Sequence, residues 1–133
     1  MYKIGQSAEF EKKITTEDVV VFSRLSGDIN PIHLDEDFAA KSIFKNRLVH
    51  GMLCSSLISS VLANTLPGEG TIYLKQELKF LAPVHHEDVL IAKVTIVEIL
   101  EEKNQMYLET IVMNKISRII VISGTALVKY PKL

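Results

Sequence analysis

The chain of 133 residues has only one cysteine, Cys54. No disulfide can form within the chain, which fits a reducing compartment. No apolar run approaches the ~20 residues that a membrane-spanning helix needs. The first six residues also lack the apolar core of a signal peptide. We therefore expect a cytoplasmic protein without a membrane partner.

The sequence also lacks an excess of charge of either sign. Lysine and arginine total 15 against 16 aspartates and glutamates, a formal net charge of −1. This balance argues against nucleic acid as a partner, although a local basic patch for a phosphorylated ligand remains compatible with it. There is no phosphate-binding glycine loop, dinucleotide fingerprint, interdomain linker or internal repeat. The length suits one hydrophobic core, so we expect residues 1–133 to form a single domain.

Helical patterns fill the N-terminal half of the chain. Thr15 or Thr16 can cap a helix that has acidic residues in its first turn and ends at Gly27. A shorter helix is expected after residue 33, capped by Asp35 and with Phe38 and Ala39 directed inward. The apolar side of the first helix is predicted to contain Val19, Val20, Phe22 and Leu25.

A third and longer helix is predicted from Gly51 to about Thr65. Apolar residues cover most of its circumference, and its polar residues are small serines. A helix that is apolar over most of its surface is a buried one. Pro67 and Gly68 end it.

The remainder of the chain has the patterns of β-strands. Residues 72–80 alternate between apolar and polar side chains, and three later segments are rich in β-branched residues. A polar hairpin is expected at 101–104. The expected strands are 8–14 at an edge, 72–80, 89–100, 106–113 and 118–128. The order favours an α+β fold in which an antiparallel sheet wraps around the long central helix.

Residues 26–33 read Ser-Gly-Asp-Ile-Asn-Pro-Ile-His and cannot be helical throughout. Pro31 removes a backbone donor and disfavours the α conformation at the preceding residue, while Gly27 admits backbone angles closed to other residues. The resulting bend can hold Asp28 close to His33, and such an acid/base pair suits water-mediated proton transfer. Because the same residue types also form ordinary surface turns, the local sequence alone leaves both interpretations open.

The motif Gly27-Asp28-x-Asn30-Pro31-x-His33 is followed by Arg47-Leu48-Val49-His50-Gly51-Met52-Leu53. Together they resemble the hydratase signature of the MaoC-like hotdog enzymes, and especially the short, single-domain (R)-specific enoyl-CoA hydratases. The resemblance runs from near residue 16 to near residue 129. It implies a single hotdog fold, an acyl-CoA thioester substrate, reversible hydration to an (R)-3-hydroxyacyl thioester, no cofactor, and a homodimer whose sheets join edge to edge.

The same resemblance implies roles for individual residues. Asp28 and His33 would hold the attacking water, although which of them is the base stays open. The N–H of Gly51, at the start of the buried helix, would stabilise the negative charge on the thioester oxygen. Alternatively, Gly51 only permits close helix–sheet packing. Asn30 would either orient the pair or merely hold the turn.

Other candidates follow from spacing along the chain. Ser59 and Leu62 follow Gly51 at intervals of about one turn, so they either line the acyl pocket or form a packing face. His50 is expected to be a buried, hydrogen-bonded residue that shapes the turn. Asp28, His33 and His50 could bind a divalent metal in principle, but the chain has no short His/Cys ligand pattern, and we expect no metal.

The remaining candidates are a pair of histidines and the single cysteine. The adjacent pair His85 and His86 follows Pro83 in an apparent turn, where solvent exposure is more plausible than metal binding. Cys54 lacks a partner that would make it a nucleophile.

Three rival functions use the same fold. An acyl thioesterase would need an acid or base facing the carbonyl carbon, whereas a hydratase needs the pair facing C3. A dehydratase for acyl-carrier-protein substrates would use the same pair. A non-catalytic acyl-CoA-binding module would be expected to lack Asp28 or His33. Both are present, which favours hydration.

Overall fold

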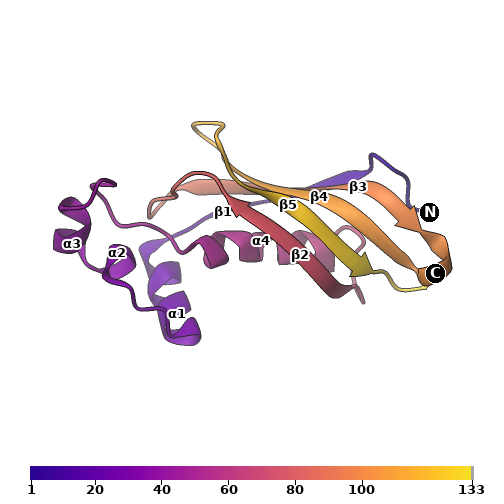
Figure 1. The fold of residues 1–133 in the computed structure, drawn as a ribbon, viewed down its shortest axis with the longest axis horizontal. Helices are drawn as coiled ribbons and strands as arrows, with labels where there is room; N and C mark the ends of the chain where they lie inside the picture. Colours follow the sequence, from indigo (N-terminus) through magenta and orange to yellow (C-terminus); the bar gives the residue numbers. More distant parts are fainter. Residues whose placement is uncertain (133) are drawn as a thin grey trace.

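The computed structural model describes residues 1–132 and contains one antiparallel sheet of five strands in the order β1-β3-β4-β5-β2. The sheet curves over the central helix α4 (Gly51–Asn64), while the shorter helices lie at one end of the molecule (Figure 1). The strands are β1 (Ser7–Lys13), β2 (Ile72–Phe80), β3 (Val89–Leu100), β4 (Gln105–Asn114) and β5 (Ile120–Lys129). The predicted α+β arrangement, including the edge strand near residue 8, is confirmed.

Strand pairing follows the alternation of the sequence. The β3–β4 hairpin closes through a short 3-10 helix, η1 (Glu101–Lys103), and Asn104 takes the left-handed conformation with φ of 53°. Alternate residues of β3, β4 and β5 point toward α4 and are fully or almost fully buried. They include Leu90, Val94, Ile96, Met106, Leu108, Val112 and Ile122. The hydrophobic core therefore lies between the sheet and the central helix.

The central helix is buried on one side only. Leu57, Ile58 and Val61 pack into the core, whereas Met52 is 59% exposed and Ser59 is also exposed. The sheet covers α4 on the β3 and β4 side and leaves part of the helix open beside β2. The predicted bounds of this helix are confirmed, but the chain by itself does not surround it.

The first helix, α1 (Thr16–Ser26), has the predicted start and end. Thr15 forms a capping box with Asp18, and Gly27 ends the helix in the left-handed conformation with φ of 81°. The prediction for Leu25 is wrong, because this side chain is 82% exposed. Helix α1 protrudes from the end of the sheet (Figure 1). The buried part of its surface, around Val19, is therefore narrower than the apolar side that the periodicity predicts.

Two short helices follow. Asp35 caps α3 (Glu36–Ala40), as predicted, and its carboxylate accepts hydrogen bonds from the backbone N–H groups of residues 37 and 38. Phe38 is 49% exposed, so its predicted inward orientation is wrong; Ala39 takes the buried position. The one-turn helix α2 (Pro31–Leu34) precedes α3 and was not predicted. Among the described residues, no helix combines the length and apolarity needed to cross a membrane.

Candidate active site

The end of α1 positions the carboxylate of Asp28. After Gly27 turns the chain, Ser26 Oγ accepts a hydrogen bond from the Asp28 N–H (3.1 Å) and donates one to the carbonyl of Phe22 (2.7 Å). Asp28 Oδ1 accepts from the Asn30 N–H at 3.2 Å. The turn therefore uses one carboxylate oxygen and leaves the other, Oδ2, available.

The next turn positions His33. Asn30 caps α2, because its side-chain oxygen accepts from the Ile32 N–H at 3.2 Å. His33 lies on this helix, and its Nδ1 is 2.9 Å from the carbonyl oxygen of Leu48. Since a carbonyl can only accept, Nδ1 carries the proton and donates it. These contacts assign Asn30 to holding the turn, and they leave Nε2 of His33 free on the side facing Asp28.

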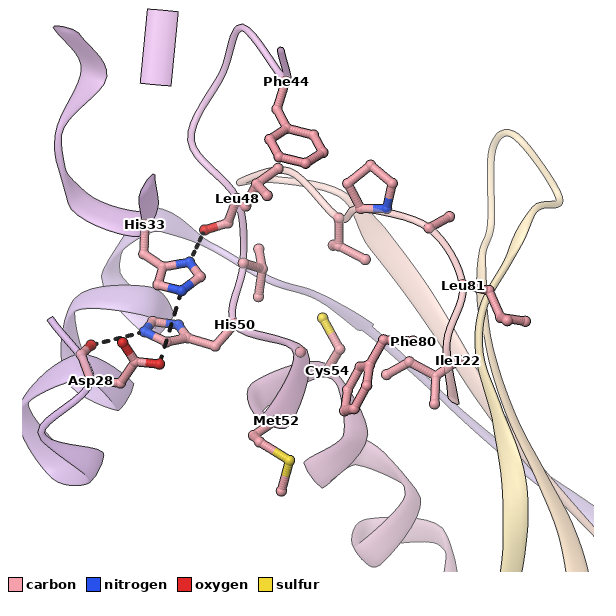
Figure 2. Close-up of a pocket in the computed structure, with 15 residues that line it drawn as sticks. Asp28, His33, Phe44, Leu48, His50, Met52, Cys54, Phe80, Leu81 and Ile122 are labelled. Atoms are coloured by element: carbon pink, nitrogen blue, oxygen red, sulfur yellow. Dashed lines mark hydrogen bonds and ion pairs between the residues drawn. The ribbon is translucent and has the colours of Figure 1, made fainter. Parts of the chain in front are cut away.

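The structure brings Asp28 and His33 together, as the motif suggested. His33 Nε2 is 4.0 Å from Asp28 Oδ2, and the two side chains point toward one another (Figure 2). This separation is too long for a direct hydrogen bond. One water bonded to both atoms at about 2.8 Å would have its two bonds about 90° apart, close to its own H–O–H angle. The pair can therefore hold a single water by both of its protons.

His50 stabilises the turn that contains Asp28. Its side chain is 2% exposed, and Nε2 lies 3.2 Å from the Asp28 carbonyl oxygen and 3.1 Å from Ser23 Oγ. Burial lowers the pKa of His50, against a smaller upward effect of the hydrogen bond to Asp28. The ring is therefore neutral near pH 7 and donates through Nε2. The predicted burial and hydrogen bonding of His50 are confirmed; its lack of a catalytic role stays a prediction.

Gly51 begins α4 beside this pair. The first N–H groups of a helix have no intrahelical acceptor and lie at its positive end. A Cβ atom at Gly51 would lie 2.6 Å from Cε1 of Phe80, so a larger residue requires the phenyl ring to move. This close contact fits the packing alternative. The oxyanion role stays a prediction.

An apolar cleft of about 590 Å³ opens from this point. Asp28 and His33 lie at one end, and the walls are lined by Phe44, Phe80, Leu81, Ile122 and other apolar side chains (Figure 2). Gly51 also lines the cleft. Cys54 also lines the cleft, but burial raises the pKa of its thiol to about 12. The arrangement places one polar, water-binding end against a pocket suited to an apolar chain.

Ser59 and Leu62 do not line this cleft. Ser59 lines a second cleft of about 580 Å³, between α4 and β2, together with Tyr73, Gln76 and Leu78. Leu62 is 2% exposed and belongs to the hydrophobic core. Met52 lines both clefts. Contact of Ser59 or Leu62 with a substrate stays a prediction.

Several residues of the site were missed in the sequence. Phe80 lies over Gly51, and its inward position in the alternation of β2 is the signal that could have found it. The carbonyl of Leu48 has no side-chain signal at all. His85 and His86 were expected in an exposed turn, but this is wrong, because both are half-buried. His86 has hydrogen bonds to Thr16 and to the carbonyl of His33.

One group of metal-capable residues is present within residues 1–132. One ligand atom from each of Asp28, His33 and His50 can be chosen so that all three lie within 4.8 Å of one another. The hydrogen bonds disfavour such a centre, because Nε2 of His50 donates to a carbonyl and Nδ1 of His33 does the same. Only one carboxylate oxygen and one imidazole nitrogen then remain on the open side. The absence of a metal stays a prediction.

Comparisons with known proteins agree with this geometry. Residues 2–117 match the family described as "MaoC like domain". The chain is 43% identical to an (R)-specific enoyl-CoA hydratase of Rhodospirillum rubrum, over 97% of this chain and 88% of the relative. It is 40% identical to a 3-hydroxybutyryl-CoA dehydratase of Methylorubrum extorquens, over 98% of this chain and 82% of the relative.

The fold is also similar to a solved structure, the (R)-hydratase of Aeromonas caviae involved in PHA biosynthesis. The TM-score is 0.95, the identity is 39%, and the match covers 98% of each chain. The predicted hotdog fold is thereby confirmed.

Proposed function

The chain belongs to the MaoC-like domain family, and on that premise we propose that it is an (R)-specific enoyl-CoA hydratase. The observation that carries the proposal is the 4.0 Å separation of His33 Nε2 and Asp28 Oδ2 at the polar end of an apolar cleft. Two acceptors at this distance can orient one water molecule, which leaves a lone pair of the water oxygen directed away from both.

The reaction follows from the chemistry of the substrate. In a trans-2-enoyl thioester the C2=C3 bond is conjugated to the carbonyl, so C3 is electrophilic. The water oxygen bonds to C3 while one of its protons passes to the Asp28/His33 pair. The electron pair of the double bond moves toward the thioester oxygen and then returns to C2, which takes a proton from the same pair, so the pair is restored. Water is consumed with no oxidant or reductant, so the reverse dehydration uses the same groups.

The start of α4 supports the developing charge. A thioester carbonyl next to Gly51 would meet a backbone N–H at the positive end of a helix of 14 residues. Such a donor acts on negative charge that exists only in the transition state, and its loss commonly costs about 3 kcal/mol. The absence of a side chain at residue 51 lets the substrate oxygen approach the backbone.

The test follows the absorbance of the conjugated enoyl thioester after purified protein is added to crotonyl-CoA. We expect the absorbance to fall without release of free thiol. Asp28→Asn and His33→Ala should each reduce the rate about 10²–10⁴-fold. Asp37→Asn serves as the matched control, because this carboxylate is exposed and lies outside the cleft. Chiral analysis of the product tests the (R) assignment.

Other outcomes separate the rivals. Release of free thiol would identify a thioesterase. Activity on acyl-carrier-protein substrates and not on CoA thioesters of several chain lengths would identify the carrier-protein dehydratase. Binding of acyl-CoA without turnover of any substrate would identify the non-catalytic module.

We also propose a homodimer formed through β2. This strand lies at an edge of the sheet, where its outer backbone groups are unpaired, and it exposes Ile72 (56%) and Leu74 (45%). Leu74→Lys should shift the protein to a monomer in light scattering. Ile116→Lys, at an exposed position of the β4–β5 connection, is the control and should leave the mass unchanged. A wild-type monomer at micromolar concentration would contradict the proposal.

We further propose that the chain forms a single domain and that the protein is cytoplasmic. A single core cluster supports one domain over residues 1–133, and one cooperative unfolding transition is the expected observation. A buried free cysteine and a CoA thioester substrate support a cytoplasmic location. Microscopy of a fluorescent fusion checks it.

A further inference from the structure

We propose that His86, together with Thr16, is a positioning residue that fixes the backbone of His33 for catalysis; the inference rests on the proposed function. His86 lies in the loop between β2 and β3, 53 residues from His33 in the sequence. Its Nε2 is 2.9 Å from the carbonyl oxygen of His33, and its Nδ1 is 3.1 Å from the hydroxyl oxygen of Thr16.

The direction of each hydrogen bond follows from the partners. The carbonyl of His33 can only accept, so Nε2 of His86 carries a proton and donates it. In a neutral ring Nδ1 is then an acceptor, and the hydroxyl of Thr16 donates to it. Burial lowers the pKa of His86, and the positive charge of Arg47 adds to this effect. The chain of hydrogen bonds runs from Thr16 through His86 to His33.

The helix that contains His33 needs such support. Helix α2 has one turn and none of its residues is fully buried. Its packing against the hydrophobic core is through the partly buried Leu34, so hydrogen bonds must contribute to its orientation. Leu48 holds it on one side, where its N–H donates to the carbonyl of Ile32 (3.0 Å) and its carbonyl accepts from His33 Nδ1 (2.9 Å). The hydrogen bond from His86 adds a second support, on the backbone of His33 itself.

Asp28 is held by its own turn and by His50. Asn30 and His50 also contact the segment of His33, Asn30 by capping α2 and His50 by stacking on the His33 ring. Ser26, Asn30 and His50 fix its turn through hydrogen bonds to residues 28 and 30. None of these contacts involves His86. Loss of the His86 ring would therefore change the position of His33 relative to Asp28 while Asp28 stays in place. A displacement of about 1 Å between groups that act together can cost on the order of 100-fold in rate.

The experiment compares four single variants and one double variant in the full chain. His86→Ala removes the donor, and we expect kcat for crotonyl-CoA to fall about 10-fold or more with KM unchanged. His86→Gln retains a terminal N–H group and should recover most of the loss. Thr16→Val should reduce kcat less, and should have no further effect in the His86→Ala background. His85→Ala is the matched control, because Nε2 of His85 has no hydrogen-bond partner within the described chain.

A second measurement does not depend on activity. The Nδ1 proton of His33, hydrogen-bonded to Leu48, can be identified by NMR from its loss in His33→Ala. Its exchange with solvent should be faster in His86→Ala than in the wild type or in His85→Ala. If the wild type hydrates no enoyl thioester, the proposed function fails and this exchange rate still decides the positioning role.

Two results would overturn the inference. One is a wild-type kcat and a wild-type exchange rate in His86→Ala. The other is an equal loss of kcat in His86→Ala and His85→Ala, because a general disturbance of the loop, and not the hydrogen bond to His33, would then explain the effect.

Discussion

The imidazole rings of His33 and His50 are stacked, with centroids 3.8 Å apart and an angle of 22° between their planes. Both rings contact Asp28. His33 faces its carboxylate, and His50 donates a hydrogen bond to its backbone carbonyl. Two positively charged rings at this distance would repel each other. Burial keeps His50 neutral by lowering its pKa, so this ring adds no positive charge beside His33.

The burial of His50 predicts how stability depends on pH. Its pKa in the folded state is below the ordinary value of 6.5, so between these two values the unfolded state binds more protons. The free energy of unfolding should therefore be greatest above about pH 6.5 and should fall as the pH decreases through that window. Urea denaturation of the wild type at about pH 7.5 and about pH 5 measures the difference.

His50→Gln isolates this contribution, because the amide keeps a donor for the Asp28 carbonyl but does not titrate. The variant should lose less stability than the wild type on acidification. His86, whose pKa is also lowered by burial, contributes in the same direction, so some pH dependence should remain. An unchanged pH dependence in His50→Gln would show that His50 is not the group responsible.

Gly51→Ala tests whether residue 51 supports catalysis or only packing. The added Cβ would lie 2.6 Å from the Phe80 ring, so the ring must move, and the methyl group would also stand beside the N–H that is expected to bind the thioester oxygen. We expect kcat to fall by about 10²-fold, with a smaller change in the free energy of unfolding. Steady-state kinetics and urea denaturation measure the two effects.

A second substitution at Phe80 separates the two explanations for Gly51. Phe80→Leu removes the ring that the new methyl group would strike, so it should relieve the packing conflict in the double variant. If the backbone N–H binds the substrate oxygen, kcat should stay low in the double variant even when stability recovers. Full recovery of kcat would mean that Gly51 matters only for packing.

Most of the fold could be predicted because it depends on local patterns. The two-residue alternation of β2, the β-branched segments of β3 and β5, and the capping residues Thr15 and Asp35 all specify structure over a few neighbouring positions. The pairing of Asp28 with His33 is also local, since only five positions separate them and the turn between them is stiff. These features required no knowledge of the rest of the chain.

The contacts that the sequence did not reveal join distant segments. Phe80 covers Gly51 only because the end of β2 and the start of α4 meet in three dimensions. His86 reaches His33 from the loop between β2 and β3. Leu25 and Phe38 were expected to be buried because periodicity identifies an apolar side of a helix. The periodicity does not predict how much of that side is covered by another helix or strand.

Gly124 is predicted to be essential for the close approach of β5 and β2. A Cβ atom at this position would lie 1.8 Å from the backbone carbonyl oxygen of Glu77, and a backbone cannot move aside as a flexible side chain can. Gly124→Ala should therefore lower the free energy of unfolding by about 1–3 kcal/mol or more. Urea denaturation measures it. Ser123→Ala, at the preceding half-buried position of β5, is the control and should change stability much less.

Cys54 is predicted to be unreactive in the folded protein although it lines the catalytic cleft. It is 1% exposed, and burial raises the pKa of its thiol to about 12, so roughly one molecule in 10⁴ carries the thiolate at pH 8. A disulfide reagent such as 5,5′-dithiobis(2-nitrobenzoate) should react slowly under native conditions and rapidly and stoichiometrically in urea. Cys54→Ala should retain most of the hydratase activity, because the proposed reaction forms no covalent intermediate. Rapid labelling of the native protein, or loss of activity in Cys54→Ala without loss of stability, would instead assign the thiol a direct role in the cleft.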